Sequence, residues 1–225
     1  MKIPVIKKIL EKNEERATEL RERFDKNNTL VLNLISSPGA GKTTLLVRTL
    51  SALKDQFKMG VIEGDIQTTA DAERIAQTGV QTVQINTDGA CHLDSNMIYA
   101  AIQKIDLNGL DILFIENVGN LVCPAEFKVG EDFKIALLSI PEGDDKPEKY
   151  PLLFSEAKVL VINKIDLLPY LDFDVEKVKR VVKTLNKDIE IFMVSAKAGQ
   201  GFDKWLTWLR NRVLEKKQGK KEREA

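Results

Sequence analysis

The stretch SSPGAGKT, residues 36–43, lies between the apolar run TLVLNLI (29–35) and the run LLVRTL (45–50). It matches the phosphate-binding pattern G-x-x-x-x-G-K-[ST], except that Ser36 stands in place of the first glycine. The run before it is typical of a buried strand and the run after it of a helix. A loop in this context directs its backbone amides at an anion, so the stretch predicts a phosphate-binding α/β protein.

Short apolar runs alternate with helical patterns along the rest of the chain. The runs predict strands at 29–35, 59–64, 80–85, 110–117, 134–140, 157–164 and 189–196, and the helical patterns fall at 5–24, 43–55, 92–105, 174–187 and 202–215. Most of the runs are apolar on both faces, which favours buried parallel strands. We therefore expect an α/β fold of the three-layer P-loop NTPase type, with a mostly parallel central sheet flanked by helices.

Composition and charge limit the organisation and the partners. The 225 residues include 34 basic and 34 acidic side chains, so no global field attracts nucleic acid or membrane, and we expect neither partner. No apolar run reaches the ~18 residues of a membrane helix, and the N-terminus becomes charged too early for a signal peptide, which favours the cytoplasm. We divide the chain into an N-terminal amphipathic helix (1–27), one nucleotide-binding domain (28–216) and a charged tail (217–225). The charged segment 141–151, which prolines bound, is expected to be a surface loop.

The phosphate loop predicts specific contacts with a nucleotide and Mg²⁺. Lys42 is expected to reach the β- and γ-phosphates, and the Thr43 hydroxyl to hold Mg²⁺. Glycine at 39 and 41 allows the unusual dihedral angles that let successive N–H groups face one anion. The residues predicted to bind the phosphates are Gly39, Ala40, Gly41, Lys42, Thr43 and Thr44.

Two later strand ends indicate that the base is guanine. The run VINKID places Asp166 where a carboxylate can accept two hydrogen bonds from guanine N1–H and its exocyclic amine, a pair that adenine does not offer. A further strand ends in SAK (195–197), which is similar to the second guanine-binding loop of small GTPases. The predicted base-binding residues are Asn163, Lys164, Asp166, Ser195, Ala196 and Lys197.

Acidic side chains end two of the predicted strands. Asp65 and Glu116 should lie at the carboxyl edge of the sheet, where the ligand of such a fold binds. We expect both to belong to the Mg²⁺ shell, with Asp65 also positioning the attacking water. The nearby Glu63 is interpreted as a member of a structural ion pair. Lys42 is the only catalytic cation that the pattern indicates, so we expect slow GTP hydrolysis.

The stretch GACHLD (89–94) carries a second kind of chemistry. His92 is the only histidine of the chain and is adjacent to Cys91, one of two cysteines; the other, Cys123, follows the Glu116 strand. Two thiols and an imidazole suit Zn²⁺ or Ni²⁺. Three ligands do not close a four-coordinate structural site, so the metal is expected to be labile, or shared on a two-fold axis if two chains meet there. Taken singly, each cysteine could instead be a small buried hydrophobe.

Several of these motifs together resemble one family. SSPGAGKTTLL, EGDIQTTADAERI, CHLD, ENVGNLVCPAEF, EGDDKPEKYP and NKIDLLPYLDFD, within about residues 28 to 215, are similar to the HypB family of hydrogenase maturation GTPases, which are SIMIBI-class P-loop GTPases. The resemblance implies GTP hydrolysis coupled to nickel delivery into [NiFe]-hydrogenase, and a Ni²⁺ or Zn²⁺ site at Cys91, His92 and Cys123 near a GTP-dependent homodimer interface. It also implies a HypA-type nickel chaperone and the hydrogenase large-subunit maturation machinery as partners.

Other interpretations stay open beside this one. Some relatives carry an N-terminal cysteine motif or a histidine-rich stretch, whereas residues 1–28 contain neither residue type, so nickel storage is not expected there. A related accessory GTPase could serve another metalloenzyme, such as urease or a cobalamin-dependent enzyme. The chain could also be a nucleotide-gated scaffold whose metal is adventitious; paired exposed thiols, which are rarely inert, disfavour this.

Overall fold

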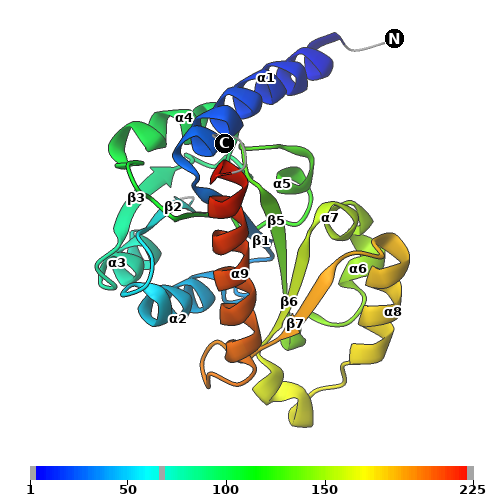
Figure 1. Cartoon of the computed structure of the whole chain (residues 1–225). Coiled ribbons are helices and arrows are strands. Elements are labelled where there is room, and N and C mark those ends of the chain that lie inside the picture. The colour runs from blue at the N-terminus through cyan, green and yellow to red at the C-terminus, as the bar shows by residue number, and fades with distance from the viewer. Residues whose placement is uncertain (1–3, 66–68, 222–225) are drawn as a thin grey trace.

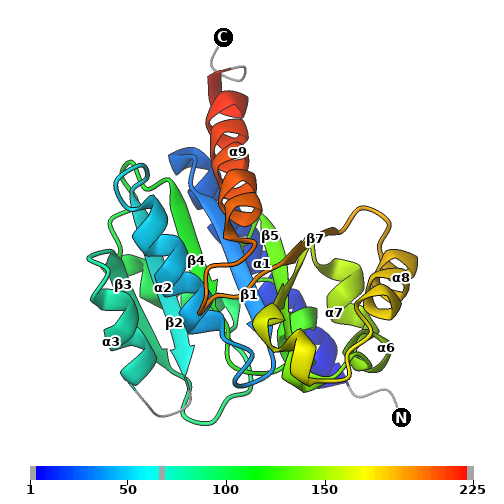
Figure 2. The same ribbon diagram turned by 90° about the horizontal axis from the view of Figure 1, so that it is seen from below.

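The molecule is organised around one parallel β-sheet (Figures 1 and 2). The structure is a computed structural model and describes residues 4–65 and 69–221. Over these residues the sheet has seven strands in the order β3-β2-β4-β1-β5-β6-β7, and every neighbouring pair is parallel. The strands are β1 (Leu30–Ser36), β2 (Met59–Asp65), β3 (Gln81–Asn86), β4 (Ile112–Glu116), β5 (Phe133–Ser139), β6 (Val159–Asn163) and β7 (Glu190–Met193). The predicted three-layer α/β fold is confirmed.

Helices cover both faces of this sheet. The α-helices are α1 (Pro4–Asn27), α2 (Lys42–Leu53), α3 (Ala70–Ala76), α4 (Ser95–Ala101), α5 (Cys123–Glu126), α6 (Lys146–Lys149), α7 (Pro151–Glu156), α8 (Val175–Leu185) and α9 (Phe202–Lys221). Short 3-10 helices are η1 (Ile102–Lys104), η2 (Ile140–Glu142) and η3 (Ile165–Tyr170). One face packs against α2, α3 and α9, and the other against α1, α4, α7 and α8 (Figures 1 and 2).

The central strand β1 explains why the sheet is buried on both sides. Leu30, Leu32 and Leu34 belong to the apolar cluster under α2 and α9. Val31 and Ile35 alternate with them and pack against the helices of the opposite face. Because side chains alternate along a strand, an almost continuous apolar run is what such a two-sided strand requires.

The predicted amphipathic helix at the N-terminus is present as α1. Its Ala17, Leu20 and Phe24 are buried against the sheet, as the periodicity predicts. The N-terminal part of α1 extends beyond the sheet (Figure 1). The side chains of residues 1–9 lie outside the described part of the chain.

One sequence prediction about a charged segment differs from the structure. The loop predicted at 141–151 is wrong, because η2, α6 and the start of α7 occupy most of this segment. Ser139 and Glu142 form a capping box, and prolines begin or nearly begin each of these helices, where a missing N–H costs nothing. The charged tail predicted from 217 is helical as far as Lys221, and residues 222–225 lie outside the described residues.

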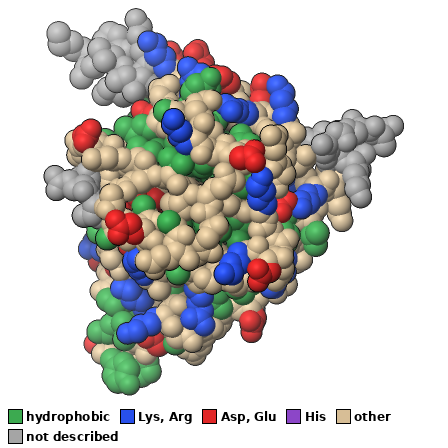
Figure 3. All heavy atoms as spheres, turned by 90° about the vertical axis from the view of Figure 1, so that its left-hand side faces the viewer, with side chains coloured by type: hydrophobic (Ala, Val, Ile, Leu, Met, Phe, Trp, Pro, Cys, Tyr) green, Lys and Arg blue, Asp and Glu red, His purple; other side chains and the backbone are tan. Residues whose placement is uncertain are grey.

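One face of the described surface is mixed in charge. On the side where α3, β3 and α4 lie, acidic and basic side chains are interspersed with apolar ones and form no large patch of one sign (Figure 3). Within the described part of the chain, no helix combines the length and the apolarity that a membrane span requires.

Candidate functional site

The phosphate loop joins β1 to α2, as the sequence predicts. Lys42 is buried, and its Nζ donates a hydrogen bond to Ser36 Oγ at 3.0 Å. The serine in the first glycine position therefore holds the loop lysine. Gly41 has φ 100°, and a Cβ there would lie 2.6 Å from Asn163 Nδ2, so only glycine fits.

A cleft of about 470 Å³ opens at the carboxyl ends of β1, β2 and β4. Of the predicted phosphate and Mg²⁺ residues, those that line this cleft are Gly39, Gly41, Lys42, Thr43, Thr44, Asp65 and Glu116. Strands of one parallel sheet end on a common edge, which explains why segments far apart in sequence converge here. The size falls in the range of small-molecule sites.

The acids of the cleft suit a hard cation. The Thr43 hydroxyl donates to Glu116 Oε1 at 2.9 Å, while Glu116 Oε2 is buried and has no hydrogen-bond partner. Burial raises the pKa of Glu116 to about 7, against the opposing charge of Lys42. Asp65 lines the same cleft. A hydroxyl, an orphaned carboxylate oxygen and a second carboxylate fit Mg²⁺, which takes oxygen ligands.

The interpretation of Glu63 as a structural ion pair is wrong. Glu63 lines the cleft, its Oε2 is buried without a hydrogen-bond partner, and no ion pair joins it to a described residue. Burial raises its pKa to about 8, and the carboxylates of Glu116 and Asp65 add to the shift. The cleft therefore contains two buried acids, Glu63 and Glu116.

The cleft also contains an arginine that the sequence reasoning missed. Arg74 of α3 lies at the edge of the cleft; its Nη2 donates to Thr44 Oγ1 at 3.2 Å, and its Nη1 lies 2.9 Å from Asp71 Oδ1. The expectation that Lys42 would be the only cation at the phosphates is therefore too narrow. The position of Arg74 in a helix that follows the Asp65 strand end was the available signal.

The base-binding motifs meet the phosphate loop from the other side. Asn163 Nδ2 donates to Ala40 O at 2.9 Å, and Asn163 Oδ1 accepts from Ala196 N at 3.0 Å. Lys164 Nζ donates to Gly39 O at 2.7 Å. Asp166 Oδ1 is buried and has no partner, which leaves an acceptor open for a base. The two predicted base loops therefore lie together beside the phosphate loop.

The three predicted metal ligands also come together. The ligand atoms of Cys91, His92 and Cys123 all lie within 4.8 Å of one another, and the two Sγ atoms are 3.1 Å apart. Cys91 is exposed and lies before α4, which begins at Ser95 rather than at the predicted residue 92. Two sulfurs and one imidazole suit Ni²⁺ or Zn²⁺ and leave coordination positions open.

The protonation of this cluster follows from its surroundings. The pKa of the Cys91 thiol is raised, chiefly by its hydrogen bond with Cys123. Burial lowers the pKa of His92, whose ring lies 4.0 Å from that of Phe127. The imidazole is therefore neutral near pH 7, the form that binds metal, whereas the thiols must lose protons when a metal binds.

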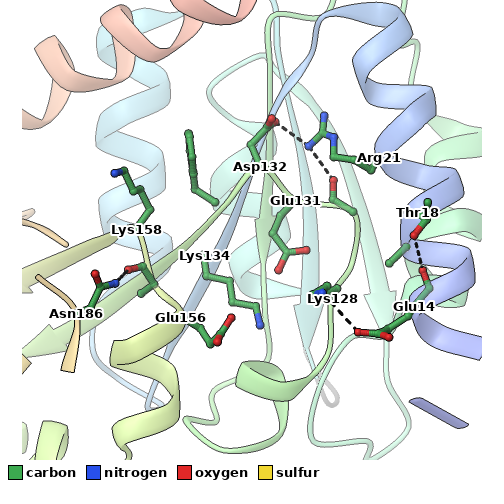
Figure 4. A pocket seen from close by; sticks show the side chains of 14 residues that line it. Glu14, Thr18, Arg21, Lys128, Glu131, Asp132, Lys134, Glu156, Lys158 and Asn186 are labelled. Atoms are coloured by element: carbon green, nitrogen blue, oxygen red, sulfur yellow. Dashed lines mark hydrogen bonds and ion pairs between the residues drawn. The ribbon is translucent and has the colours of Figure 1, made fainter. Parts of the chain in front are cut away.

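A second cleft, of about 550 Å³, contains none of the predicted site residues (Figure 4). It lies between α1, the first residues of β5 and the residues just before β6, and charged side chains of both signs line it. Lys134 extends from β5 in this cleft, and its buried Nζ donates to Ala125 O of α5. Because α5 begins at Cys123, this lysine supports the helix that carries one metal ligand.

Comparison with known proteins gives consistent matches. A family model described as "CobW/HypB/UreG, nucleotide-binding domain" matches residues 30–193. Hydrogenase maturation factor HypB of Escherichia coli K12 is 54% identical over 201 residues, covering 89% of this chain and 69% of that protein. Hydrogenase/urease maturation factor HypB of Helicobacter hepaticus is 45% identical over 206 residues, covering 90% and 84%. A crystal structure of HypB from Helicobacter pylori in complex with nickel has a TM-score of 0.86 and 42% identity, covering 91% of this chain and 96% of that one.

Proposed function

Because the chain belongs to the CobW/HypB/UreG family of P-loop GTPases and, within it, to the HypB hydrogenase maturation factors, we propose that GTP binding and hydrolysis control its Cys/His metal site during nickel delivery to [NiFe]-hydrogenase. One observation carries this proposal. The chain segment that leaves the nucleotide cleft at Glu116 reaches the metal ligand Cys123 only seven residues later. Nucleotide and metal therefore bind to two ends of one short segment.

GTP would bind with its phosphates at Lys42 and its base at Asp166. Mg²⁺ would be held by Thr43 and Glu116, with Asp65 in the same shell and beside the attacking water. Mg²⁺ would supply charge neutralisation for the phosphates. The orphaned Oε2 of Glu116 and the orphaned Oδ1 of Asp166 support these roles, since both are buried acceptors without partners. Lys42 and Arg74, two of the basic residues that line the cleft, would face the charge that develops on the phosphates in the transition state.

The metal would bind at Cys91, His92 and Cys123. Nickel is the metal named for the related crystal structure from Helicobacter pylori, and Zn²⁺ is expected to compete at a site with two sulfurs. Metal binding releases thiol protons, so it should strengthen as pH rises.

The open coordination supports GTP-dependent dimerisation at this face. Val122, next to Cys123, is 51% exposed, and Cys91 is exposed as well. A second copy meeting this face across a two-fold axis would cover Val122 and double the number of sulfur donors. The metal would then be shared or released as the dimer forms and separates.

The test is to measure nickel affinity with GDP and with a non-hydrolysable GTP analogue, in the presence of Mg²⁺. We expect the two affinities to differ by about tenfold, a typical coupling between two sites of one protein. A double variant, Cys91→Ala with Cys123→Ala, should abolish tight binding in both states. Equal affinities in the wild-type protein would contradict the coupling.

The cellular setting is part of the same proposal. We expect a cytoplasmic protein whose partners are a HypA-type nickel chaperone and the hydrogenase large-subunit maturation machinery, with neither nucleic acid nor membrane as a partner. We assign residues 28–216 to the GTPase domain, preceded by α1 and followed by the charged tail. The Helicobacter hepaticus relative is named for both hydrogenase and urease maturation, which favours urease as a second client. Deletion of the chain, followed by assays of both enzymes at low nickel, separates these clients.

A further inference from the structure

The segment from Asn117 to Asn120 forms a wall shared by the nucleotide cleft and the metal cluster. It follows β4 directly after Glu116 and precedes α5, which begins at Cys123. On the nucleotide side it packs tightly on the phosphate loop: a Cβ at Gly119 would lie 2.8 Å from Pro38 Cγ and 3.0 Å from the Pro38 backbone. The loop around Pro38 and this segment are therefore in close contact, so the loop cannot move toward Gly119 without displacing the segment.

Side chains on the other side of the wall hold the Cys91–His92 segment. The buried Asn117 accepts hydrogen bonds at Oδ1 from Leu93 N and from its neighbour Val118 N, each at 3.0 Å. Its Nδ2 donates to Asn33 Oδ1 of β1 at 3.1 Å, which fixes the amide orientation. Asn120 Nδ2 donates to Cys91 O at 3.1 Å. Two amide side chains of the wall thus bind the backbone on both sides of His92.

Leu93 makes a second contact with the nucleotide cleft. Its side chain is fully buried, and a Cβ at Gly64 would lie 2.8 Å from it. Gly64 precedes Asp65, which lines the cleft. The residue after His92 is therefore packed between the ends of β2 and β4, the two strands that carry the acids of the cleft.

Asn13 of α1 offers a matched contrast to Asn117. Its Oδ1 accepts from Ser95 N at 2.8 Å and its Nδ2 donates to Lys128 O at 2.8 Å, so it binds both metal-carrying segments. It is buried as Asn117 is, but it does not line the nucleotide cleft. Asn13 can support the shape of the metal cluster without sensing the nucleotide.

We propose that Asn117 is a positioning residue that transmits the nucleotide state to Cys91 and His92, with Asn120 as a second link. This inference rests on the proposed function and names the residues that carry its regulation. A rearrangement at Glu116 moves the adjacent Asn117, and the bond from Leu93 N carries that movement to His92. Cys123 lies further along the same segment, so the distances among the three ligand atoms change together.

The experiment compares nickel affinities in the two nucleotide states for four proteins: wild type, Asn117→Ala, Asn120→Ala and Asn13→Ala. Affinity is measured by competition with a chromophoric chelator, and the nickel–thiolate charge-transfer band gives an independent reading of the ligand geometry. If the wild-type ratio of affinities is about tenfold, Asn117→Ala should bring it within about twofold. Asn120→Ala should lower the ratio to an intermediate value. Asn13→Ala should weaken binding by a similar factor in both states and keep the ratio.

The outcomes separate this inference from the proposed function. A wild-type ratio of one contradicts the proposed function and the relay with it. A wild-type ratio that survives both Asn117→Ala and Asn120→Ala contradicts the relay alone, as does a ratio that Asn13→Ala lowers as much as Asn117→Ala. GDP binding and thermal melting confirm folding; if Asn117→Ala does not fold, the half-exposed Asn120 still decides the result.

Discussion

The nucleotide cleft and the metal cluster lie close together but are built in different ways. The cleft is assembled from the carboxyl ends of β1, β2 and β4, and its Lys42 and Glu116 are buried and bonded within the chain. The cluster is made of three side chains from two segments outside the strands, with Cys91 exposed. The register of the sheet fixes the first site, whereas side chains from other elements hold the second. We therefore expect changes in the supporting side chains to alter the metal affinity while nucleotide binding stays the same.

The largest effect should come from Lys42→Ala, which removes the buried cation of the cleft. We expect GTP hydrolysis to fall by about 10²–10³-fold, because the positive charge at the β- and γ-phosphates is lost. Nickel affinity without nucleotide should stay within about twofold. Steady-state phosphate release and chelator competition measure the two quantities, with Lys54→Ala, an exposed lysine at the end of the same helix, as the control. If Lys42→Ala reduced GTP hydrolysis and nickel affinity by the same factor, the structure of the metal cluster would depend on Lys42, and the two sites would not be independent.

The converse variant, Cys91→Ser, should affect only the cluster. Loss of one of three ligands should weaken nickel binding by roughly 10²-fold, because a hydroxyl is a poor ligand where a thiolate is needed. Metal-free GTP hydrolysis should remain within about twofold of the wild-type rate. If hydrolysis fell as strongly as nickel affinity, the exposed thiol would be part of the nucleotide site, and the contrast between the two sites would fail.

Sequence reasoning was most successful where the chemistry lies in one short stretch. The spacing of Gly39, Gly41 and Lys42 and the order of NKID and SAK identify residues that the structure brings together at one edge of the sheet. The position of each depends on a single strand end, and their contacts with a nucleotide stay predictions. Glu63 was misinterpreted because its environment depends on two other strands, β3 and β4, which flank it in the sheet. Without that register, the sequence could not show that Glu63, two residues before Asp65, is buried and has a carboxylate oxygen without a hydrogen-bond partner.

The buried acids of the cleft make a prediction about pH. The pKa of Glu63 is raised to about 8 from 4.5, so the folded protein keeps a proton that the unfolded chain releases above about pH 4.5. The stability that this proton contributes is therefore complete at low pH and is lost as pH rises toward 8; Glu116, with a pKa of about 7, acts in the same direction. Urea unfolding of the nucleotide-free wild type should show this fall, and Glu63→Gln should remove on the order of 2 kcal/mol of it.

The control for this experiment is Glu22→Gln, an exposed glutamate of α1. It should leave the pH dependence of the free energy of unfolding unchanged. A Glu63→Gln profile that matches wild type would mean that Glu63 is ionised in the folded protein. The cleft would then hold an ionised Glu63 near Lys42 before nucleotide binds.

The supports of the metal cluster were beyond reach of the sequence for a general reason. Asn13 lies in α1, Lys134 in β5 and Asn117 in the loop after β4. Asn117 stands in the stretch ENVGNLVCPAEF, but the letters of that stretch do not show its bond with Leu93 N. Each of the three side chains acts through a hydrogen bond to a backbone group of the ligand-carrying segments, and a backbone partner leaves no pattern in the sequence. The helices at 141–151 were also missed. Here the sequence did offer a signal, because Ser139 and Glu142 have the spacing of a capping box.

The smallest predicted effect tests these remote supports through Lys134→Met. Methionine fills a similar volume without the buried ammonium, whose pKa is lowered by burial, so the free energy of unfolding should stay the same or rise slightly. Ala125 O then loses its donor, and α5 can shift at the end opposite Cys123. We expect nickel affinity to fall by about threefold, roughly 0.6 kcal/mol, with GTP affinity unchanged.

Lys158→Met, at the rim of the same cleft, is the matched control and should change neither affinity (Figure 4). Nickel affinity equal in both variants would show that the cluster is as self-contained as the nucleotide cleft, because its geometry would then survive the loss of a buried support.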